Sequence, residues 1–193
     1  MKPAKLLPFF EKIGELKKIK RTGWLHWGVN DAEHVSDHAF RMAVMAMLFA
    51  KELKCNELKL VKLALVHDLQ ESICGDLVLD YSKYLPESKG LSAEEKERLE
   101  RQALAELCSF LDEKTEKEFK KLWMEAEHGK SREARIVRQL DKLEMLLQAS
   151  EYEREKNCKK PLFRAFMQSS SHQIEEKQLK QFLGKIEEKN RQV

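Results

Sequence analysis

The segment 61–76 holds a group of polar residues that an ordinary helix core does not need. His67 and Asp68 are adjacent in it, Glu71 follows one helical turn later, and Asp76 closes it. The segment begins as an apolar run, and an unpaired carboxylate or imidazole among apolar side chains is costly. A bound metal ion is the simplest group that neutralises such a cluster. The segment therefore predicts metal chemistry, with further ligands supplied from elsewhere in the chain.

Two residues outside this segment complete a ligand set. His38 lies in an apolar frame between Val35 and Met42, and Asp141 lies among leucines. With the His–Asp pair they give two imidazoles and two carboxylates. This mixed nitrogen and oxygen set suits an octahedral divalent ion, Mn²⁺, Co²⁺, Fe²⁺ or Mg²⁺, better than a closed structural Zn²⁺ site. No two cysteines have zinc-knuckle spacing, which excludes that kind of site.

Amphipathic periodicity predicts the helices that must position these residues. Helices are expected at 6–19, 35–53, 56–73, 93–111, 113–127, 132–156, a short piece from 161, and 173–189. Asn56, Ser92 and Ser131 are the expected N-caps. No segment combines the alternation of a strand with turn signals. The fold class is therefore expected to be all-α, a helical bundle.

Length and composition favour one domain. A chain of 193 residues can form one domain with a real core, and only seven glycines and four prolines leave few turns. We expect a single domain over 1–193, with its core at about 5–156 and additional C-terminal helices at about 161–189. The apolar stripes of those last helices either cover the core or bury a partner.

Charge and hydropathy exclude several classes of partner. The net charge of +3, from 36 basic and 33 acidic residues, is too balanced to predict a nucleic-acid polymer or a membrane as partner. The longest apolar run, at 42–50, is far shorter than the roughly 20 residues that span a bilayer. No signal-peptide pattern is present, and four scattered cysteines predict reduced thiols. We expect a cytoplasmic protein, also nuclear in a eukaryote.

Two stretches outside the helices carry further candidates. Residues 21–30 are expected to form an irregular loop with two tryptophans, Trp24 and Trp27, which either pack inward or line a pocket. The stretch after Asp76 is longer than a tight helix connection and contains Lys83. Loops of that length are often functional.

The order H…HD…D in an all-helical chain resembles the HD-domain superfamily of metal-dependent phosphohydrolases. Four longer strings are similar to one group of it, the HD-domain-containing protein 2 group, which is related to the bacterial 5′-deoxynucleotidases. These strings are RTGW, DAEHVSDHAFRMAVMAM, LALVHDLQESICGD and QLDKLEMLLQASEYE. The likeness extends over about residues 5–185, and four ordered blocks are far more specific than one dipeptide.

The resemblance implies a single HD domain with 5′-deoxynucleotidase activity, which hydrolyses deoxyribonucleoside 5′-monophosphates to deoxynucleoside and phosphate. It implies a homodimer and four metal ligands: His38, His67, Asp68 and Asp141. It also places Glu71 and Asp76 beside the reacting phosphate. The candidate substrate contacts are Arg21, Trp24, Glu33 and Lys83.

The chemistry of the residues supports this interpretation. A phosphomonoester needs neutralised non-bridging oxygens and an activated water, and one metal ion can serve both needs. Glu71, four residues after His67, is expected on the same helix face, where it could hold or deprotonate the water. Asp76, freed from the helix by Gly75, could assist or protonate the leaving 5′-oxygen. The sequence leaves open which carboxylate plays which part.

The substrate contacts follow from residue type. Arg21 is the candidate phosphate anchor and Lys83 a second one. Trp24 could stack on the base or sugar. Trp24 and Glu33 are also expected to help shape the sugar pocket.

Alternatives remain at this stage. Only His128 lies between the His–Asp pair and Asp141, which favours one strongly bound ion over a histidine-rich pair, with a weaker second ion at Glu71 and Asp76 as an option. Another HD phosphohydrolase, either a phosphodiesterase or a nucleotide pyrophosphohydrolase, is the runner-up enzyme. A non-catalytic nucleotide-binding helical module is the third, although its pocket would not need a water-activating carboxylate.

Overall fold

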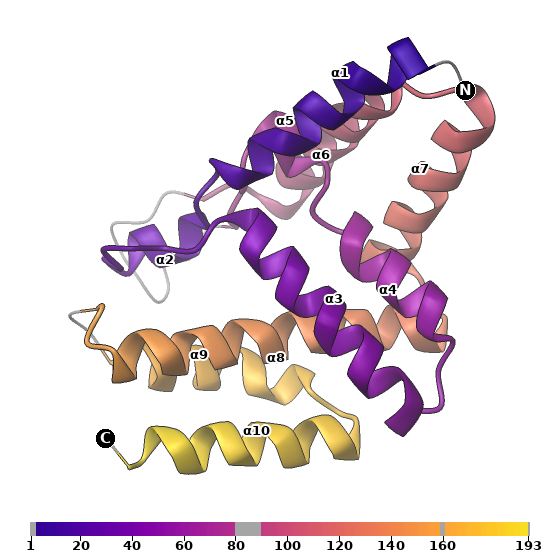
Figure 1. Cartoon of the computed structure of the whole chain (residues 1–193). Helices are drawn as coiled ribbons and strands as arrows, with labels where there is room; N and C mark the ends of the chain where they lie inside the picture. The colour runs from indigo at the N-terminus through magenta and orange to yellow at the C-terminus, as the bar shows by residue number, and fades with distance from the viewer. Residues whose placement is uncertain (1–2, 80–89, 159–160, 193) are drawn as a thin grey trace.

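The computed structural model describes residues 3–79, 90–158 and 161–192, with 3–5 as backbone only (Figure 1). Lys83 lies outside these residues. The elements are α1 (Pro3–Gly14), η1 (Glu15–Lys17), α2 (Thr22–His26), α3 (Val35–Glu52), α4 (Glu57–Val66), α5 (Glu71–Cys74), α6 (Ala93–Cys108), α7 (Glu113–His128), α8 (Arg132–Arg154), α9 (Leu162–Ser170), η2 (Ser171–Gln173) and α10 (Lys177–Asn190). Within the described ranges no strand occurs, and the only bridges are isolated. The expected all-α class is confirmed.

The three predicted N-caps are confirmed. The side-chain oxygens of Asn56, Ser92 and Ser131 each accept the backbone N–H three residues further on, at 3.0–3.2 Å. Each bond satisfies one of the amide donors that a helix leaves unpaired at its start. The caps therefore fix the beginnings of α4, α6 and α8, the last of which carries Asp141.

The predicted helix 56–73 is wrong beyond its first ten residues. Helix α4 ends at Val66, and α5 begins at Glu71 after a turn. In a continuous helix the N–H of Glu71 would bond to the carbonyl of His67. That carbonyl instead accepts the indole N–H of Trp123 at 3.1 Å, and Glu71 N–H bonds to the Asp68 carbonyl at 3.1 Å. Glu71 and His67 therefore do not lie in one continuous helix, contrary to expectation.

The predicted loop at 21–30 is also wrong in part, because α2 occupies its middle. The helix begins where the carboxylate of Asp76 accepts the backbone N–H of Thr22 at 2.6 Å. This cap comes from a residue more than fifty positions away, so the local sequence gives no sign of it. The consequence is that α2 and the end of α5 are held together.

Two apolar clusters make the core. The larger involves α3, α4, α8, α9 and α10, while the smaller joins α1, α6 and α7 to the end of α4. Leu122 on α7 packs against both. In Figure 1, α10 runs alongside α8, and α1 lies beside α5 and α6 at the other end of the molecule. No helix among the described residues is long and apolar enough to cross a bilayer.

Candidate active site

Three segments bring the four predicted metal ligands to one place. His38 comes from α3, His67 and Asp68 from the turn after α4, and Asp141 from α8. The Nε2 atoms of the two histidines are 3.3 Å apart. Oδ2 of Asp68 lies 3.1 Å from Nε2 of His67, and Oδ1 of Asp141 lies 3.4 Å from Nε2 of His38. Ligand atoms about 2.0–2.2 Å from one ion lie roughly 3 Å apart, so the spacing of the His38, His67 and Asp68 atoms suits one shared ion, with Asp141 beside His38.

Hydrogen bonds at Nδ1 fix the orientation of both imidazole rings. Nδ1–H of His67 donates to the carbonyl of Ala64 at 2.7 Å, and Nδ1–H of His38 donates to the carboxylate of Glu144. Both acceptors lack a proton to give, so the proton of each neutral ring is on Nδ1. Both Nε2 lone pairs therefore point into the same acceptor-rich space, which suits a cation.

The pKa shifts of His38 and Asp68 agree with a site that binds a cation. Burial and Arg21 lower the pKa of His38, but the carboxylates of Glu144 and Asp141 outweigh them and raise it to about 10. Burial would raise the pKa of Asp68, yet His67 and Arg21 hold it well below its usual range. The group thus attracts positive charge strongly. A divalent ion fits this site because it can take the place of the protons.

Arg21 lies beside this group, as predicted. Its Nη1 is 3.4 Å from Oδ2 of Asp68. Burial lowers its pKa, but Asp68 and the nearby Asp76 and Asp141 raise it above its ordinary value, so the guanidinium stays charged. Arg21 is also the residue before α2, whose first N–H is capped by Asp76. Its backbone is therefore fixed next to the candidate metal ligands.

Glu71 is a buried carboxylate at the same site, with only 3% of its surface exposed. Among the described residues, its Oε2 is buried without a hydrogen-bond partner. Burial first, and then the charges of Asp68 and Asp76, raise the pKa of Glu71 well above its usual range. A buried oxygen without a partner is costly, so Glu71 has the features of a group that awaits a ligand or a water.

Asp76 faces the same space after a tight turn. Gly75 has φ +76°, a conformation that favours glycine, and α5 ends immediately before it. The expectation that Gly75 frees Asp76 from the helix is confirmed. One carboxylate oxygen of Asp76 is already occupied by the N–H of Thr22, so this side chain is more constrained than Glu71.

Trp24 and Glu33 form a pair behind the site. Trp24 is 2% exposed, and its indole N–H donates to Oε1 of Glu33 at 2.9 Å. The Trp24 ring packs edge-on against Tyr152, with the centroids 5.4 Å apart. The Glu33 carboxylate also lies close to His38 and Glu144. Their predicted substrate contacts stay predictions, and the structure adds that most of the Trp24 ring is buried.

A cavity of about 680 Å³ opens beside these residues. Five charged residues of its lining are expected site residues, and the others come from α6, α7 and α8: Arg21, Asp68, Glu71, Asp76 and Asp141, with Lys96, Glu100, Glu127 and Lys142. The volume is in the range that small-molecule sites occupy. The ligand group thus opens onto a cavity large enough for a small phosphorylated compound.

A family model described as HD domain matches residues 13–182. The chain belongs to the HD domain family. It is 39% identical over 184 residues to the 5′-deoxynucleotidase HDDC2 of Mus musculus, an alignment that covers 95% of this chain and 87% of the relative. The 5′-deoxynucleotidase HDDC2 of Dictyostelium discoideum is 44% identical, with 77% of this chain and 78% of the relative covered.

Solved structures agree with this membership. A predicted metal-dependent phosphohydrolase of Magnetospirillum magnetotacticum superposes with a TM-score of 0.75 at 25% identity, covering 98% of this chain and 92% of that one. HD domains are metal-dependent, and the chain is a hydrolase of this family. The resemblance predicted from the H…HD…D order is confirmed.

The sequence prediction missed a pair of residues that hold one ligand of this HD domain. Glu144 is fully buried and accepts from both His38 and Arg41, the latter at 2.7 Å. Arg41 also binds Gln148 and Glu151 on α8. A signal existed: Arg41 is three residues after His38, and Glu144 three after Asp141, so each pair shares a helix face.

We expect Glu144→Ala to weaken metal binding about ten- to hundredfold, because the His38 ring loses the acceptor that orients it. Glu144→Gln should lose less, since its amide oxygen can still accept from Nδ1–H. Calorimetric titration of the metal-free protein with Mn²⁺ measures both. Glu151→Ala is the matched control, because it removes a partner of Arg41 that does not contact His38. Equal affinity in wild type and Glu144→Ala would contradict the prediction.

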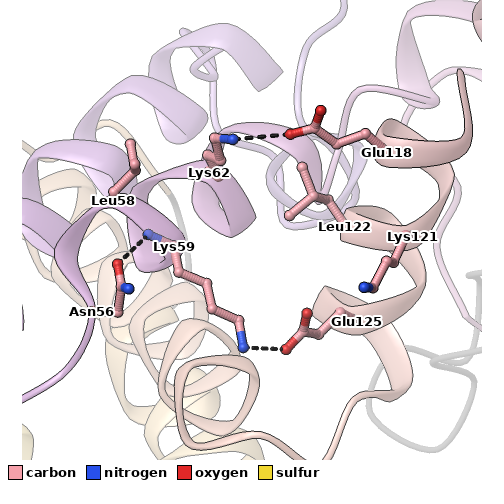
Figure 2. A pocket seen from close by; sticks show the side chains of 8 residues that line it. All are labelled: Asn56, Leu58, Lys59, Lys62, Glu118, Lys121, Leu122 and Glu125. Atoms are coloured by element: carbon pink, nitrogen blue, oxygen red, sulfur yellow. Dashed lines mark hydrogen bonds and ion pairs between the residues drawn. The ribbon is translucent and has the colours of Figure 1, made fainter. Parts of the chain in front are cut away.

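A second pocket, of about 380 Å³, lies between α4 and α7 (Figure 2). Two lysines of α4 form ion pairs with glutamates of α7: Lys59 lies 2.6 Å from Glu125, and Lys62 lies 2.9 Å from Glu118. These pairs join two helices at the surface. The pocket holds none of the predicted site residues, so we place the chemistry in the larger cavity.

Proposed function

We propose that the chain is a metal-dependent 5′-deoxynucleotidase. The observation that carries the proposal is the convergence of two imidazoles and two carboxylates beside a cavity that also contains Arg21 and the unpartnered Glu71. The relatives named 5′-deoxynucleotidase support it. The substrates are deoxyribonucleoside 5′-monophosphates, and the products are the deoxynucleoside and phosphate.

We propose that His38, His67, Asp68 and Asp141 hold one divalent ion, with Mn²⁺, Co²⁺ or Mg²⁺ favoured over structural Zn²⁺ by the mixed nitrogen and oxygen donors. When bound, such an ion neutralises phosphate charge and lowers the pKa of a coordinated water. Glu71 and Asp76 are the candidates for a weaker second ion. Both carboxylates line the cavity.

Within this proposal each side chain has a distinct task. Arg21 binds the non-bridging oxygens of the phosphate, with Lys83 as a further candidate. Glu71 holds the attacking water and accepts its proton, because its free Oε2 has no competing partner among the residues described. The oxygen of this water bonds to phosphorus as the bond from phosphorus to the 5′-oxygen breaks. The 5′-oxygen takes up a proton, for which Asp76 is the proposed donor.

In the same proposal, Trp24 and Glu33 lie near the sugar of the substrate. Trp24 lines the cavity with part of its ring, and its bond to Glu33 fixes that ring in place. We expect Glu33 to act through Trp24 rather than by direct contact. The two residues thereby limit the space around the 2′ position.

Phosphate release from a panel of ribo- and deoxyribonucleoside 5′-monophosphates, each with Mn²⁺, Co²⁺ and Mg²⁺, tests the proposal. We expect release from the deoxy compounds in preference to the ribo compounds. Inactivity on every compound would refute the proposal. Release of pyrophosphate from added nucleoside triphosphates would favour a pyrophosphohydrolase, and cleavage only of added nucleotide diesters would favour a phosphodiesterase. Binding in a thermal-shift assay without turnover would indicate a non-catalytic nucleotide-binding module.

We also propose one domain over 1–193 that works in the cytoplasm without nucleic-acid or membrane partners. Leu122 links the two apolar clusters, which supports a single domain. Cys55, Cys74 and Cys108 are thiols in the structure, which suits a reducing compartment.

A homodimer is part of the proposal, and an exposed stripe on α3 supports it. Phe40, Val44 and Leu48 are spaced four residues apart, with 71%, 38% and 71% of their surfaces exposed. Contiguous exposed apolar residues commonly mark an interface. We expect Leu48→Glu to shift a dimer towards monomer in light scattering. Leu7→Glu, at an exposed leucine of α1, is the control, and a wild-type monomer at micromolar concentration would contradict the dimer.

A further inference from the structure

The lining of the cavity beside the ligand group contains two kinds of residue. One set is charged, as described above, and includes the candidate ligands Asp68 and Asp141. An uncharged set from α8 and α9 carries apolar, hydroxyl or amide groups: Met145, Ala165, Phe166, Gln168 and Ser169. The C-terminal helix α9 therefore does more than cover the core, because it forms a wall of the cavity.

Met145 is an uncharged lining residue on the same helix as a candidate metal ligand. It lies four residues after Asp141 on α8, so the two side chains share a face about 5.4 Å apart along the helix axis. Both residues line the cavity, and Met145 is only partly buried. Met145 is thus an apolar group one helical turn beyond a candidate metal ligand.

Phe166, on α9, also lines the cavity and belongs to an aromatic cluster. Its ring lies 4.8 Å from the ring of Trp24 at an interplanar angle of 35°, and 5.9 Å from the ring of Trp27. These contacts hold the Phe166 ring, which remains partly exposed and lines the cavity. A thioether and an aromatic ring are well suited to contact the face of a flat ligand.

We propose that Met145 and Phe166 form the site for the nucleobase of the substrate. The inference rests on the proposed function, in which the phosphate lies against the charged lining residues. A nucleobase is uncharged and planar, with apolar faces and polar edges, and the uncharged lining residues match these properties. Gln168, which also lines the cavity, can donate as well as accept, so the site accommodates bases with different edges.

Comparison of dAMP with 2-deoxyribose 5-phosphate, which has the same sugar phosphate without a base, tests the site. Stacking on an aromatic side chain commonly changes affinity by about tenfold or more per base. We therefore expect wild-type kcat/KM to be at least about tenfold higher for dAMP. Equal values for the two compounds would overturn the base site but leave the phosphomonoesterase intact, whereas no release from either would refute the proposed function itself.

Two variants locate the site. Phe166→Leu keeps apolar volume but removes the aromatic plane, and Met145→Ala removes the thioether side chain. Each should lower kcat/KM for dAMP about five- to tenfold and leave the value for 2-deoxyribose 5-phosphate within about twofold. Phe182→Leu on α10 is the matched control, because Phe182 packs against Phe49 away from the cavity.

The pattern over both substrates decides the outcome. A loss for dAMP alone in both cavity variants supports the base site, even if one variant is less stable than wild type. Unchanged discrimination between the two compounds in both variants would overturn it and assign the base to another wall. The same loss in Phe182→Leu as in Phe166→Leu would also overturn it, since the effect would then be general.

Discussion

Replacing Asp68 with asparagine is expected to lower phosphate release from deoxynucleotides by about a thousandfold or more. Asp68 lies within 3.1 Å of Nε2 of His67 and 3.4 Å from Arg21, so its charge serves both the metal-ligand group and the phosphate anchor. Asparagine keeps the size but removes the charge. The loss of several kcal/mol of metal-derived stabilisation corresponds to this factor. Release of phosphate from dAMP at saturating Mn²⁺ measures it.

The same variant should bind Mn²⁺ more weakly, which calorimetric titration records separately from turnover. Asp31→Asn is the matched control, because Asp31 is exposed and lies outside the cavity. Its activity should equal that of the wild type. Full activity of Asp68→Asn with unaltered metal binding would exclude Asp68 as a ligand, and with it the proposed arrangement of the site.

Replacing Glu71 with glutamine is expected to lower kcat about 10²- to 10⁴-fold, because the variant cannot accept the proton of the attacking water. Glutamine fits the same buried space. Since Glu71 is not one of the four proposed ligands of the main ion, that ion should remain bound. KM for dAMP should change little, as Arg21 is unaltered. Steady-state kinetics together with the metal content of the purified variant give all three quantities.

Glu127→Gln provides the control for this experiment. Glu127 also lines the cavity, and burial raises its pKa to about 7, so its removal changes the cavity charge in a similar way. We expect its kcat within about threefold of the wild type. If both variants lost activity equally, the general charge of the cavity would explain the result, and the assignment of Glu71 to the water would fail.

Much of the architecture follows from local sequence. The apolar periodicity places the helices, and the caps Asn56, Ser92 and Ser131 fix three of their starts. These signals are readable because side chains three and four residues apart share a helix face and because a cap bonds within its own first turn. The order of His38, the His–Asp pair and Asp141 also predicts which side chains form the site, since few other arrangements satisfy them in an apolar frame.

The break between α4 and α5 depended on tertiary structure. The indole of Trp123, more than fifty residues away, bonds to the carbonyl that Glu71 would otherwise use, so α4 and α5 are separate helices. The start of α2 likewise depends on Asp76. Sequence patterns describe neighbours along one helix, whereas these bonds join separate segments.

The sequence by itself determined the all-α class, the metal-ligand candidates and the family. Only the tertiary structure decided what surrounds them: Glu144 and Arg41 behind His38, the buried Glu71 oxygen, and α9 as a cavity wall. Each of these depends on the packing of helices that are distant in the chain. Residue type specifies which bonds a side chain can make, but the fold specifies which partners come within reach.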